Sequence, residues 1–217
     1  SQPEIQLPAP VLKQIKRISD LETDLDIEFI IQDSPELIQD SLEGTERIKK
    51  IVLGLKDFAR PEEQGLQPVD INKSINSTLD VVWNKIKDKA AVTKDFGALP
   101  LVRIYAQDLN QVFMNILLNA ADAIEDRGEI KIVTRALNEY VEVIISDTGA
   151  GIPEENLSKI FDPFFTTKKI GAGEGLGLNF AYNIIQKCNG TIDVQSAVGQ
   201  GTAFTIRIPV RPVTDDD

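Results

Sequence analysis

Residues 111–126 read QVFMNILLNAADAIED, and this stretch decides the fold. Its apolar residues recur every three to four positions, which predicts a helix over about 107–126 with one face in a core. The same helix carries Asn115, Asn119 and Asp122 at intervals of four and three residues, so these polar groups share one stripe. Polar groups beside a core need a partner or a ligand, and the stripe is therefore a candidate binding surface.

The composition bounds the class of protein. The chain has 217 residues, 42% of them hydrophobic, which suffices for one large domain with a smaller element. A net charge of −11 gives no basic field of the kind that nucleic-acid binding needs. Cys188 is the only cysteine, so an intramolecular disulfide and a thiolate metal site are excluded, and we expect a reducing, cytoplasmic compartment. No apolar run approaches the roughly 18–20 residues of a membrane span, so no membrane contact is expected within these residues.

Two further features of the composition constrain the interpretation. The sequence has no histidine, which excludes a histidine base, a histidine metal ligand and a histidine phosphate acceptor within the chain. It starts at Ser1, and its only methionine is Met114. This indicates a piece of a longer protein and is compatible with a membrane-associated parent.

The first 60 residues are typical of helices. Apolar residues at helical spacing predict one helix over about 11–22, whereas 24–33 fits no single pattern. Ser34 and Pro35 have the character of a helix cap and a first helical turn, and we expect this second helix to run to Ala59. An apolar stripe along the second helix needs a partner helix, which favours a homodimer.

A linker is expected over 61–69, and from Asp70 the pattern changes to alternating helices and strands. Asp70 is predicted to cap a helix that runs to about Lys89. Gly190 follows a predicted helix over 176–189 and is typical of a helix C-terminus. Strands are predicted over about 91–96, 101–105, 130–135, 140–146, 191–196 and 202–209, with a loop-rich region over 147–175. We therefore expect a helical segment over 1–60, the linker, a domain over 70–212 and a disordered tail over 213–217.

The segment DTGAGIPEEN starts at Asp147, directly after the apolar run VEVIIS. An acid at the end of a buried strand needs a partner or a ligand. Gly149 and Gly151 allow the backbone to approach a ligand closely. Taken alone, the segment fits a strand followed by a glycine turn equally well.

The segment GAGEGLGLNFAYNII places four glycines directly before an apolar helix: Gly171, Gly173, Gly175 and Gly177. The backbone amides of a glycine loop and of a helix N-terminus form an anion site suited to phosphates. It is not a Walker loop, because G-K-[ST] is absent, and it does not follow a strand as a dinucleotide fingerprint does. Upstream, KIFDPFFTTKK offers three phenylalanines, which fit either a small satellite core or the packing face of a lid. Lys168 and Lys169 are local cations or ordinary surface lysines.

Four sequence blocks follow one another in a specific order. They are N-x3-N-x2-D from Asn115, D-x-G-x-G from Asp147, F-D-P-F-F with the glycine-rich helix start, and G-x-G-T ending at Thr202. Together they resemble the ATP-binding fold of the gyrase, heat-shock chaperone, histidine kinase and mismatch-repair ATPases, over about 70–210. The segment GTERIKKIVLGLKDFARP looks like the second helix of a histidine-kinase dimerisation domain.

The chain is thus similar to sensor histidine kinases of two-component systems. The resemblance implies an α+β fold, a two-layer sandwich with a mixed or antiparallel sheet covered by helices on one face. It also implies that the remnant of an α-helical hairpin precedes this sandwich.

The resemblance implies how residues would surround a bound ATP and Mg²⁺. Asn119 would offer its amide oxygen to Mg²⁺, and Asn115 would contact the phosphates or metal-bound water. Asp147 would accept a hydrogen bond from the exocyclic amine of adenine, with Thr202 beside it. The other implied contacts with the nucleotide come from Asp122, Gly149, Gly151, Ile152, Lys168, Gly173, Gly175, Leu176, Gly177 and Leu178.

Asn115 separates kinases from hydrolases within this resemblance. The hydrolytic members carry a glutamate there as a base for water, and an asparagine cannot take a proton. Catalysis is then expected to rest on positioning and charge neutralisation, with Asn115 and Lys168 as catalytic residues. Glu174 departs from the small hydroxyl residue that is usual in the family, and a carboxylate near the phosphates would weaken ATP binding.

The implied reaction is transfer of the γ-phosphoryl group of MgATP to a histidine, with onward transfer to an aspartate of a response-regulator partner. Since the chain has no histidine, the acceptor is expected outside these residues, and this piece alone is not expected to phosphorylate itself. Two other hypotheses stay open: a serine kinase of the anti-sigma-factor type, and a non-catalytic nucleotide-binding module that only dimerises. The long helix before residue 60 argues against the serine kinase, and the intact Asn115, Asn119 and Asp147 argue against the non-catalytic module.

Overall fold

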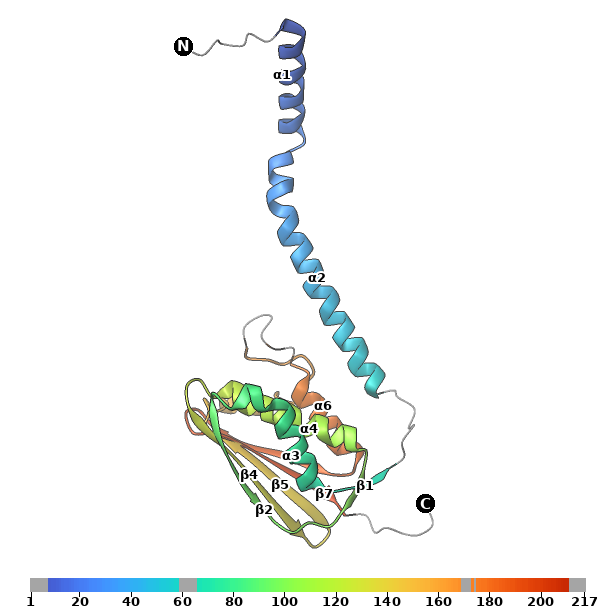
Figure 1. Ribbon diagram of the computed structural model, residues 1–217, viewed down its shortest axis with the longest axis vertical. Helices are drawn as coiled ribbons and strands as arrows, with labels where there is room; N and C mark the ends of the chain where they lie inside the picture. Colours follow the sequence, from blue (N-terminus) through green and yellow to red (C-terminus); the bar gives the residue numbers. More distant parts are fainter. Residues whose placement is uncertain (1–7, 59–65, 169–172, 174, 211–217) are drawn as a thin grey trace. The chain divides into compact units, whose positions relative to one another are not determined.

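The structure is a computed structural model that describes residues 8–58, 66–168, 173 and 175–210. The chain forms two units, Ser1–Pro61 and Glu62–Asp217. The first unit contains helices α1 (Ala9–Asp24) and α2 (Ile27–Phe58). The second contains the sheet and the remaining helices (Figure 1). Four features of the sequence lie outside the described residues: Lys169, Gly171, Glu174 and the tail 213–217.

Helix α2 begins earlier than the sequence indicated. It starts at Ile27, and Pro35 lies inside it. The prediction that Ser34 caps this helix is therefore wrong. The reason is that Ile27, Ile30 and Ile31 continue the helical spacing upstream of the proline. A proline in a helix removes one backbone donor and favours a kink, but it does not always end the helix.

The apolar side chains of the two N-terminal helices are exposed. Leu12, Ile15 and Ile18 of α1 are 53%, 49% and 56% exposed, and Leu42 of α2 is 60% exposed. The pair of helices is confirmed, but the side chains that a helical hairpin would bury stay exposed in the single chain. Among the helices in the described ranges, none combines the length and the apolar character needed to cross a membrane.

The second unit is built on one five-stranded sheet with the order β2-β4-β5-β7-β6. Its strands are β2 (Ala90–Phe96), β4 (Gly128–Leu137), β5 (Tyr140–Asp147), β6 (Thr191–Ala197) and β7 (Gly201–Pro209). β2 is parallel to β4, whereas the other neighbouring strands are antiparallel. The predicted mixed sheet is therefore confirmed, and β7, the last strand in sequence, lies between β5 and β6.

Helices cover one face of this sheet (Figure 1). They are α3 (Ile71–Ile86), α4 (Ala106–Ala123) and α6 (Gly177–Lys187). The predicted cap of α3 is confirmed, because the Asp70 carboxylate accepts a hydrogen bond from the Lys73 amide at 3.0 Å. The last residues of the predicted linker form β1 (Gln67–Val69), which pairs with β3 (Val102–Ile104). The loop-rich region contains the short helix α5 (Glu154–Leu157).

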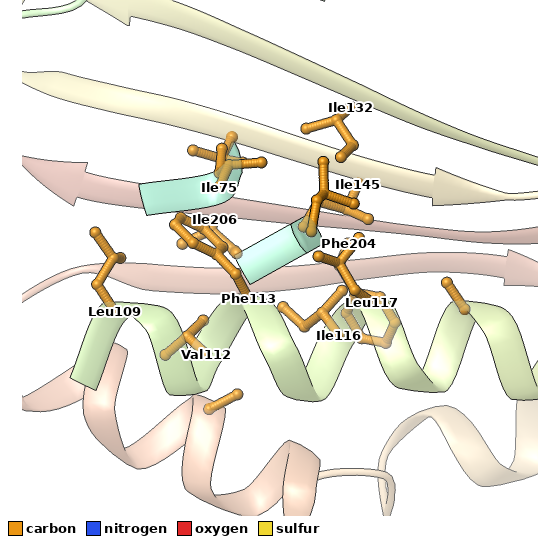
Figure 2. Packing of buried hydrophobic residues seen from close by; sticks show 14 of the residues in the cluster. Ile75, Leu109, Val112, Phe113, Ile116, Leu117, Ile132, Ile145, Phe204 and Ile206 are labelled. Carbon is orange, nitrogen blue, oxygen red and sulfur yellow. The ribbon is translucent and has the colours of Figure 1, made fainter. Parts of the chain in front are cut away.

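The core lies between the helices and the covered face of the sheet. Strand β5 alternates, with Val141, Val143 and Ile145 buried and the residues between them partly exposed. Figure 2 shows Phe113 and Leu117 of α4 between that helix and the strands. Because side chains alternate along a strand, Asp147 lies on the same face as the buried residues of β5. The fold thus places a carboxylate at the end of an otherwise apolar row.

The end of α6 differs from its prediction. The residue in the left-handed conformation is Asn189, with φ 57°, and not Gly190. Asparagine tolerates this conformation better than most residues do. Gly190 is required for a steric reason, because a Cβ there would lie 2.4 Å from the carbonyl oxygen of Arg207. The glycine permits the close approach of the turn to β7.

Candidate functional site

Asp147 ends β5 and is buried, with 8% of the residue exposed. Its Oδ1 accepts a hydrogen bond from the Gly149 amide at 2.8 Å, and it is the cross-strand neighbour of Thr202 on β7. Burial raises the pKa of this carboxyl, and hydrogen bonds from the backbone of Gly149 and Thr202 offset part of the rise. The structure thus brings the two predicted partners, Asp147 and Thr202, side by side. A buried carboxylate with hydrogen-bonding capacity left over suits a ligand that donates a hydrogen bond.

The glycine turn after Asp147 is clamped on both sides. A Cβ at Gly149 would lie 2.6 Å from the carbonyl oxygen of Ala123, at the end of α4. Gly151 has φ 72°, and a Cβ there would lie 2.0 Å from the carbonyl oxygen of Ala197. Hydrogen bonds also join the turn to both sides, since Ala150 donates to Ala123 at 2.9 Å and accepts from Gly199 at 2.7 Å. Both predicted glycines are therefore required by close packing of the backbone.

A serine hydroxyl joins this turn to the final hairpin. The Oγ of Ser196 on β6 accepts a hydrogen bond from the Ile152 amide at 2.8 Å. It donates to the carbonyl oxygen of Gly201 at 2.8 Å and lies 2.9 Å from the Oγ1 of Thr202. Asp147, Ser196, Gly201 and Thr202 also help to line a hollow of about 380 Å³ at this end of the sheet.

The prediction from sequence did not include Ser196. The signal that would have found it is the register of the last hairpin, which sets Ser196 opposite Thr202. The strands were expected over 191–196 and 202–209, so the two hydroxyl residues already stood at the base of one turn.

The polar stripe on α4 divides into three environments. The Nδ2 of Asn115 donates to the carbonyl oxygen of Gly177 at 2.9 Å, and its Oδ1 accepts from Gln111 at 3.1 Å. Asn119 is half-buried, and its amide forms no hydrogen bond to any residue that the structure describes. Asp122 is exposed and forms an ion pair with Lys168. Asn115 therefore joins α4 to the start of α6, whereas the amide of Asn119 has no hydrogen-bond partner among the described residues.

The start of α6 has the character of an anion site. Leu176 precedes the helix and provides no side-chain cap, so the first backbone amides of α6 have no side-chain acceptor from this position. Gly175 has φ 66°, and its carbonyl oxygen accepts from the Phe164 amide at 2.9 Å. A Cβ at Gly173 would lie 2.9 Å from Cδ of Lys168. The glycines, the helix start and a lysine are thus adjacent, as the sequence indicated.

Lys168 is held by a carboxylate. Its Nζ lies 2.6 Å from Oδ2 of Asp122, and the two side chains are 35% and 50% exposed. An ion pair this exposed is screened by water and stabilises the fold by less than about 1 kcal/mol. Lys168 can therefore exchange this partner for another anion at small cost.

The phenylalanine-rich segment packs on α6. The ring of Phe161 lies 5.1 Å from that of Tyr182, and the carbonyl oxygen of Phe161 accepts from Asn179 at 2.7 Å. Phe165 is half-buried against the core, whereas Phe164 is 46% exposed. Of the two predicted roles, the satellite-core role applies to Phe161 and Phe165.

The donor set determines which metals fit. Within the described ranges, no three His, Cys, Asp or Glu side chains gather into a metal-binding group. The free amide of Asn119 is a single oxygen ligand. This fits Mg²⁺, which keeps several waters and takes phosphate oxygens as ligands, and it does not fit a cage built by the protein alone.

Residues 105–212 match the family described as "Histidine kinase-, DNA gyrase B-, and HSP90-like ATPase". Sensor histidine kinase ZraS of Escherichia coli (strain K12) is 34% identical over 184 residues, which cover 83% of this chain and 39% of ZraS. The chain therefore spans about two fifths of the length of this curated relative.

Two solved structures extend the comparison. The catalytic domain of the histidine kinase ThkA, in a nucleotide-free form, is 30% identical with a TM-score of 0.62. The match covers 69% of this chain and 100% of that domain. Full-length ShkA in complex with AMPPNP shares the fold, with a TM-score of 0.66 at 20% identity over 82% of this chain and 38% of ShkA.

Proposed function

Because the chain belongs to the histidine kinase-, DNA gyrase B- and HSP90-like ATPase family, as the catalytic domain of a two-component sensor histidine kinase, we propose that it transfers the γ-phosphoryl group of MgATP to a histidine outside these residues. The phosphoryl group then passes to an aspartate of a response regulator. The observation that carries the proposal is the buried carboxylate of Asp147 beside Thr202, on the same unit as the free amide of Asn119 and the glycine-rich start of α6.

Asp147 selects the base in this proposal. Its buried carboxylate accepts a hydrogen bond from the exocyclic amine of adenine, whereas guanine presents a carbonyl oxygen that the carboxylate repels. Gly149 and Gly151 bring the backbone close to the ring. Ile152 and Leu178, which are half-buried against the core, supply apolar contact with its faces.

The phosphates bind at the start of α6. The first amides of the helix and the backbone of Gly173, Gly175, Leu176 and Gly177 donate hydrogen bonds to them. Lys168 leaves Asp122 and neutralises part of the phosphate charge. Glu174, which lies outside the described residues, carries an opposing charge between Gly173 and Gly175 in the sequence, and we expect this charge to weaken ATP binding.

Asn119 would hold Mg²⁺ through its amide oxygen, and phosphate oxygens and water would be the other ligands. The ion supplies neutralisation of the negative charge on the transferred group. Asn115 stays neutral and keeps α4 and the start of α6 in register through Gly177. Since no carboxylate occupies its position, water is not activated and the phosphoryl group is kept for the histidine.

The N-terminal helices are expected to pair with those of a second copy of the chain. Their exposed apolar residues, among them Leu12, Ile15 and Leu42, would be buried in a homodimer. A domain that uses ATP in this way works in the cytoplasm.

The test incubates this chain with Mg²⁺, γ-labelled ATP and the longer protein, in which the nucleotide site has been inactivated by Asp147→Asn. A label that is lost in acid and survives base supports transfer to histidine. A label that survives acid and is lost in base indicates the serine-kinase alternative. Binding of MgATP without any label would leave only a nucleotide-binding module.

A further inference from the structure

The hydroxyl of Ser196 has three hydrogen-bonding neighbours within the protein. Three oxygen or nitrogen atoms lie within 2.9 Å of its Oγ, on Ile152, Gly201 and Thr202. They belong to two separate segments: Ile152 to the glycine turn, and Gly201 and Thr202 to the start of strand β7. Ser196 thus lies where the two elements beside Asp147 meet.

The direction of each hydrogen bond follows from counting protons. A serine hydroxyl has one proton to donate and can accept two hydrogen bonds. The amide of Ile152 can only donate, and the carbonyl oxygen of Gly201 can only accept. The single proton of Ser196 is therefore used on Gly201, and the remaining contact requires Thr202 to donate its own proton to Ser196.

This direction fixes the chemical character of Thr202. With its proton directed to Ser196, the Oγ1 of Thr202 has only lone pairs left for a ligand. The neighbouring carboxylate of Asp147 is also an acceptor. The cross-strand pair therefore offers acceptors alone to a purine edge.

We propose that Ser196 is a positioning residue that determines base specificity, by holding Thr202 as a hydrogen-bond acceptor beside Asp147. The inference rests on the proposed function, since it takes the adenine to lie at Asp147. The class of ligand it selects is a purine nucleotide with an exocyclic amine and no carbonyl group at that edge. Without Ser196, the Thr202 hydroxyl would rotate and could donate to the carbonyl oxygen of guanine.

The experiment measures the dissociation constants of ATP and GTP by isothermal titration calorimetry, for the native chain and for Ser196→Ala. We expect the variant to bind ATP several-fold more weakly, because Ile152 and Thr202 both lose a partner. GTP binding should stay unchanged or become tighter, so the preference for ATP over GTP falls about tenfold. A purely structural role would weaken both nucleotides by the same factor.

Three further variants separate the proposed role of Ser196 from a general loss of structure. Ser196→Cys fills the same space with a weak donor and acceptor, so it should lower the preference in the same direction even where Ser196→Ala fails to fold. Ser196→Thr keeps the hydroxyl and should keep the preference. Thr191→Ala is the matched control, because Thr191 is exposed at the opposite end of the same strand and should leave both constants unchanged.

The outcomes separate the two proposals. If the native chain binds neither nucleotide, or shows no preference for ATP, the proposed function fails. If the native chain prefers ATP and the folded Ser196→Ala and Ser196→Cys variants keep the same ratio of constants, the role of Ser196 is wrong while the ATP site stands. A ratio that falls in both variants and is retained in Ser196→Thr supports the inference.

Discussion

The two ends of the site are built in contrasting ways. At one end, Asp147 and Thr202 are buried and Ser196 is hydrogen-bonded to a turn that the backbone clamps from both sides. At the other end, Lys168 is exposed in a screened ion pair, and Asn119 has no hydrogen-bond partner among the described residues. In the proposed function, the base would therefore bind groups that are already held in position, whereas the phosphates and Mg²⁺ would bind Lys168, which must leave Asp122, and Asn119, whose amide is not held by another side chain of the described residues. Substitutions at the first end should alter specificity, and those at the second should alter the response to Mg²⁺ and salt.

Asp147→Asn should have the largest effect of the variants that test this comparison. The amide presents donors where the adenine amine needs an acceptor, so we expect ATP affinity to fall by about 100-fold or more. Isothermal titration calorimetry with MgATP measures the loss. An affinity within twofold of the native value would show that adenine does not lie at Asp147.

The same variant should not lose stability. Burial raises the pKa of Asp147 above 3.8 in the folded state, so the native carboxylate destabilises the fold once both states are ionised. The free energy of unfolding of the native chain should fall as the pH rises from about 3.8 through the raised pKa, and Asp147→Asn should remove this dependence. Denaturant unfolding across that range measures it. At neutral pH the variant should be as stable as the native chain or more so.

Asn119→Ala tests the phosphate end. We expect the affinity for ATP in the presence of Mg²⁺ to fall on the order of tenfold, since one ligand to a charged group is lost. The affinity measured in excess chelator should stay the same, and so should the thermal midpoint, because the amide forms no hydrogen bond within the described residues. If ATP binding by the variant still responds to Mg²⁺ as in the native chain, another residue holds the metal.

Gly175→Ala tests whether the backbone conformation before α6 matters for ATP binding. A Cβ there would lie 2.4 Å from the carbonyl carbon of Phe164, at φ 66°. Strain of this kind costs about 1–3 kcal/mol, and we expect ATP affinity to fall several-fold as the loop shifts. The matched control is Gly199→Ala, because Gly199 has φ 75° with nothing within 4 Å. Equal losses of ATP affinity in both variants would assign the effect to backbone strain and not to the contact with Phe164.

Lys168→Gln should have the smallest effect. We expect a loss of about two- to fivefold in ATP affinity that becomes smaller at high salt, because an exposed charge is screened. The free energy of unfolding should change by less than about 1 kcal/mol. Lys159→Gln makes the same change of charge on a neighbouring exposed segment and should leave the affinity unchanged. Equal losses in the two variants would mean that only the net charge matters.

Much of the sheet and its helices followed from local patterns. The alternation of VEVIISD predicts β5, and the apolar spacing of α4 predicts its buried face, because each pattern depends only on residues in the same element. The cap at Asp70 is also local. Helix α2 was misjudged at Ser34 because a proline is a weak signal when apolar spacing continues on both sides of it.

Contacts between segments that are distant in the sequence could not be predicted from local patterns. The sequence indicated that Gly190 ends α6, whereas its glycine is required by the approach of Arg207 from β7. The hydrogen bonds of Asn115 to Gln111 and Gly177 depend on how α6 docks on α4, and its expected contact with the phosphates stays a prediction. Among the candidate residues, the pairing of Asp147 with Thr202 is reproduced by the register, and the contacts with nucleotide stay predictions.

The order of the strands has a consequence for biosynthesis. Strand β7 is made last among the strands but enters the sheet between β5 and β6. In a growing polypeptide, the edge of β5 that faces away from β4 therefore stays unpaired, and Asp147 lacks its neighbour Thr202, until β7 has left the ribosome. A translation product that ends before β7 would therefore expose one edge of β5, and exposed strand edges favour aggregation.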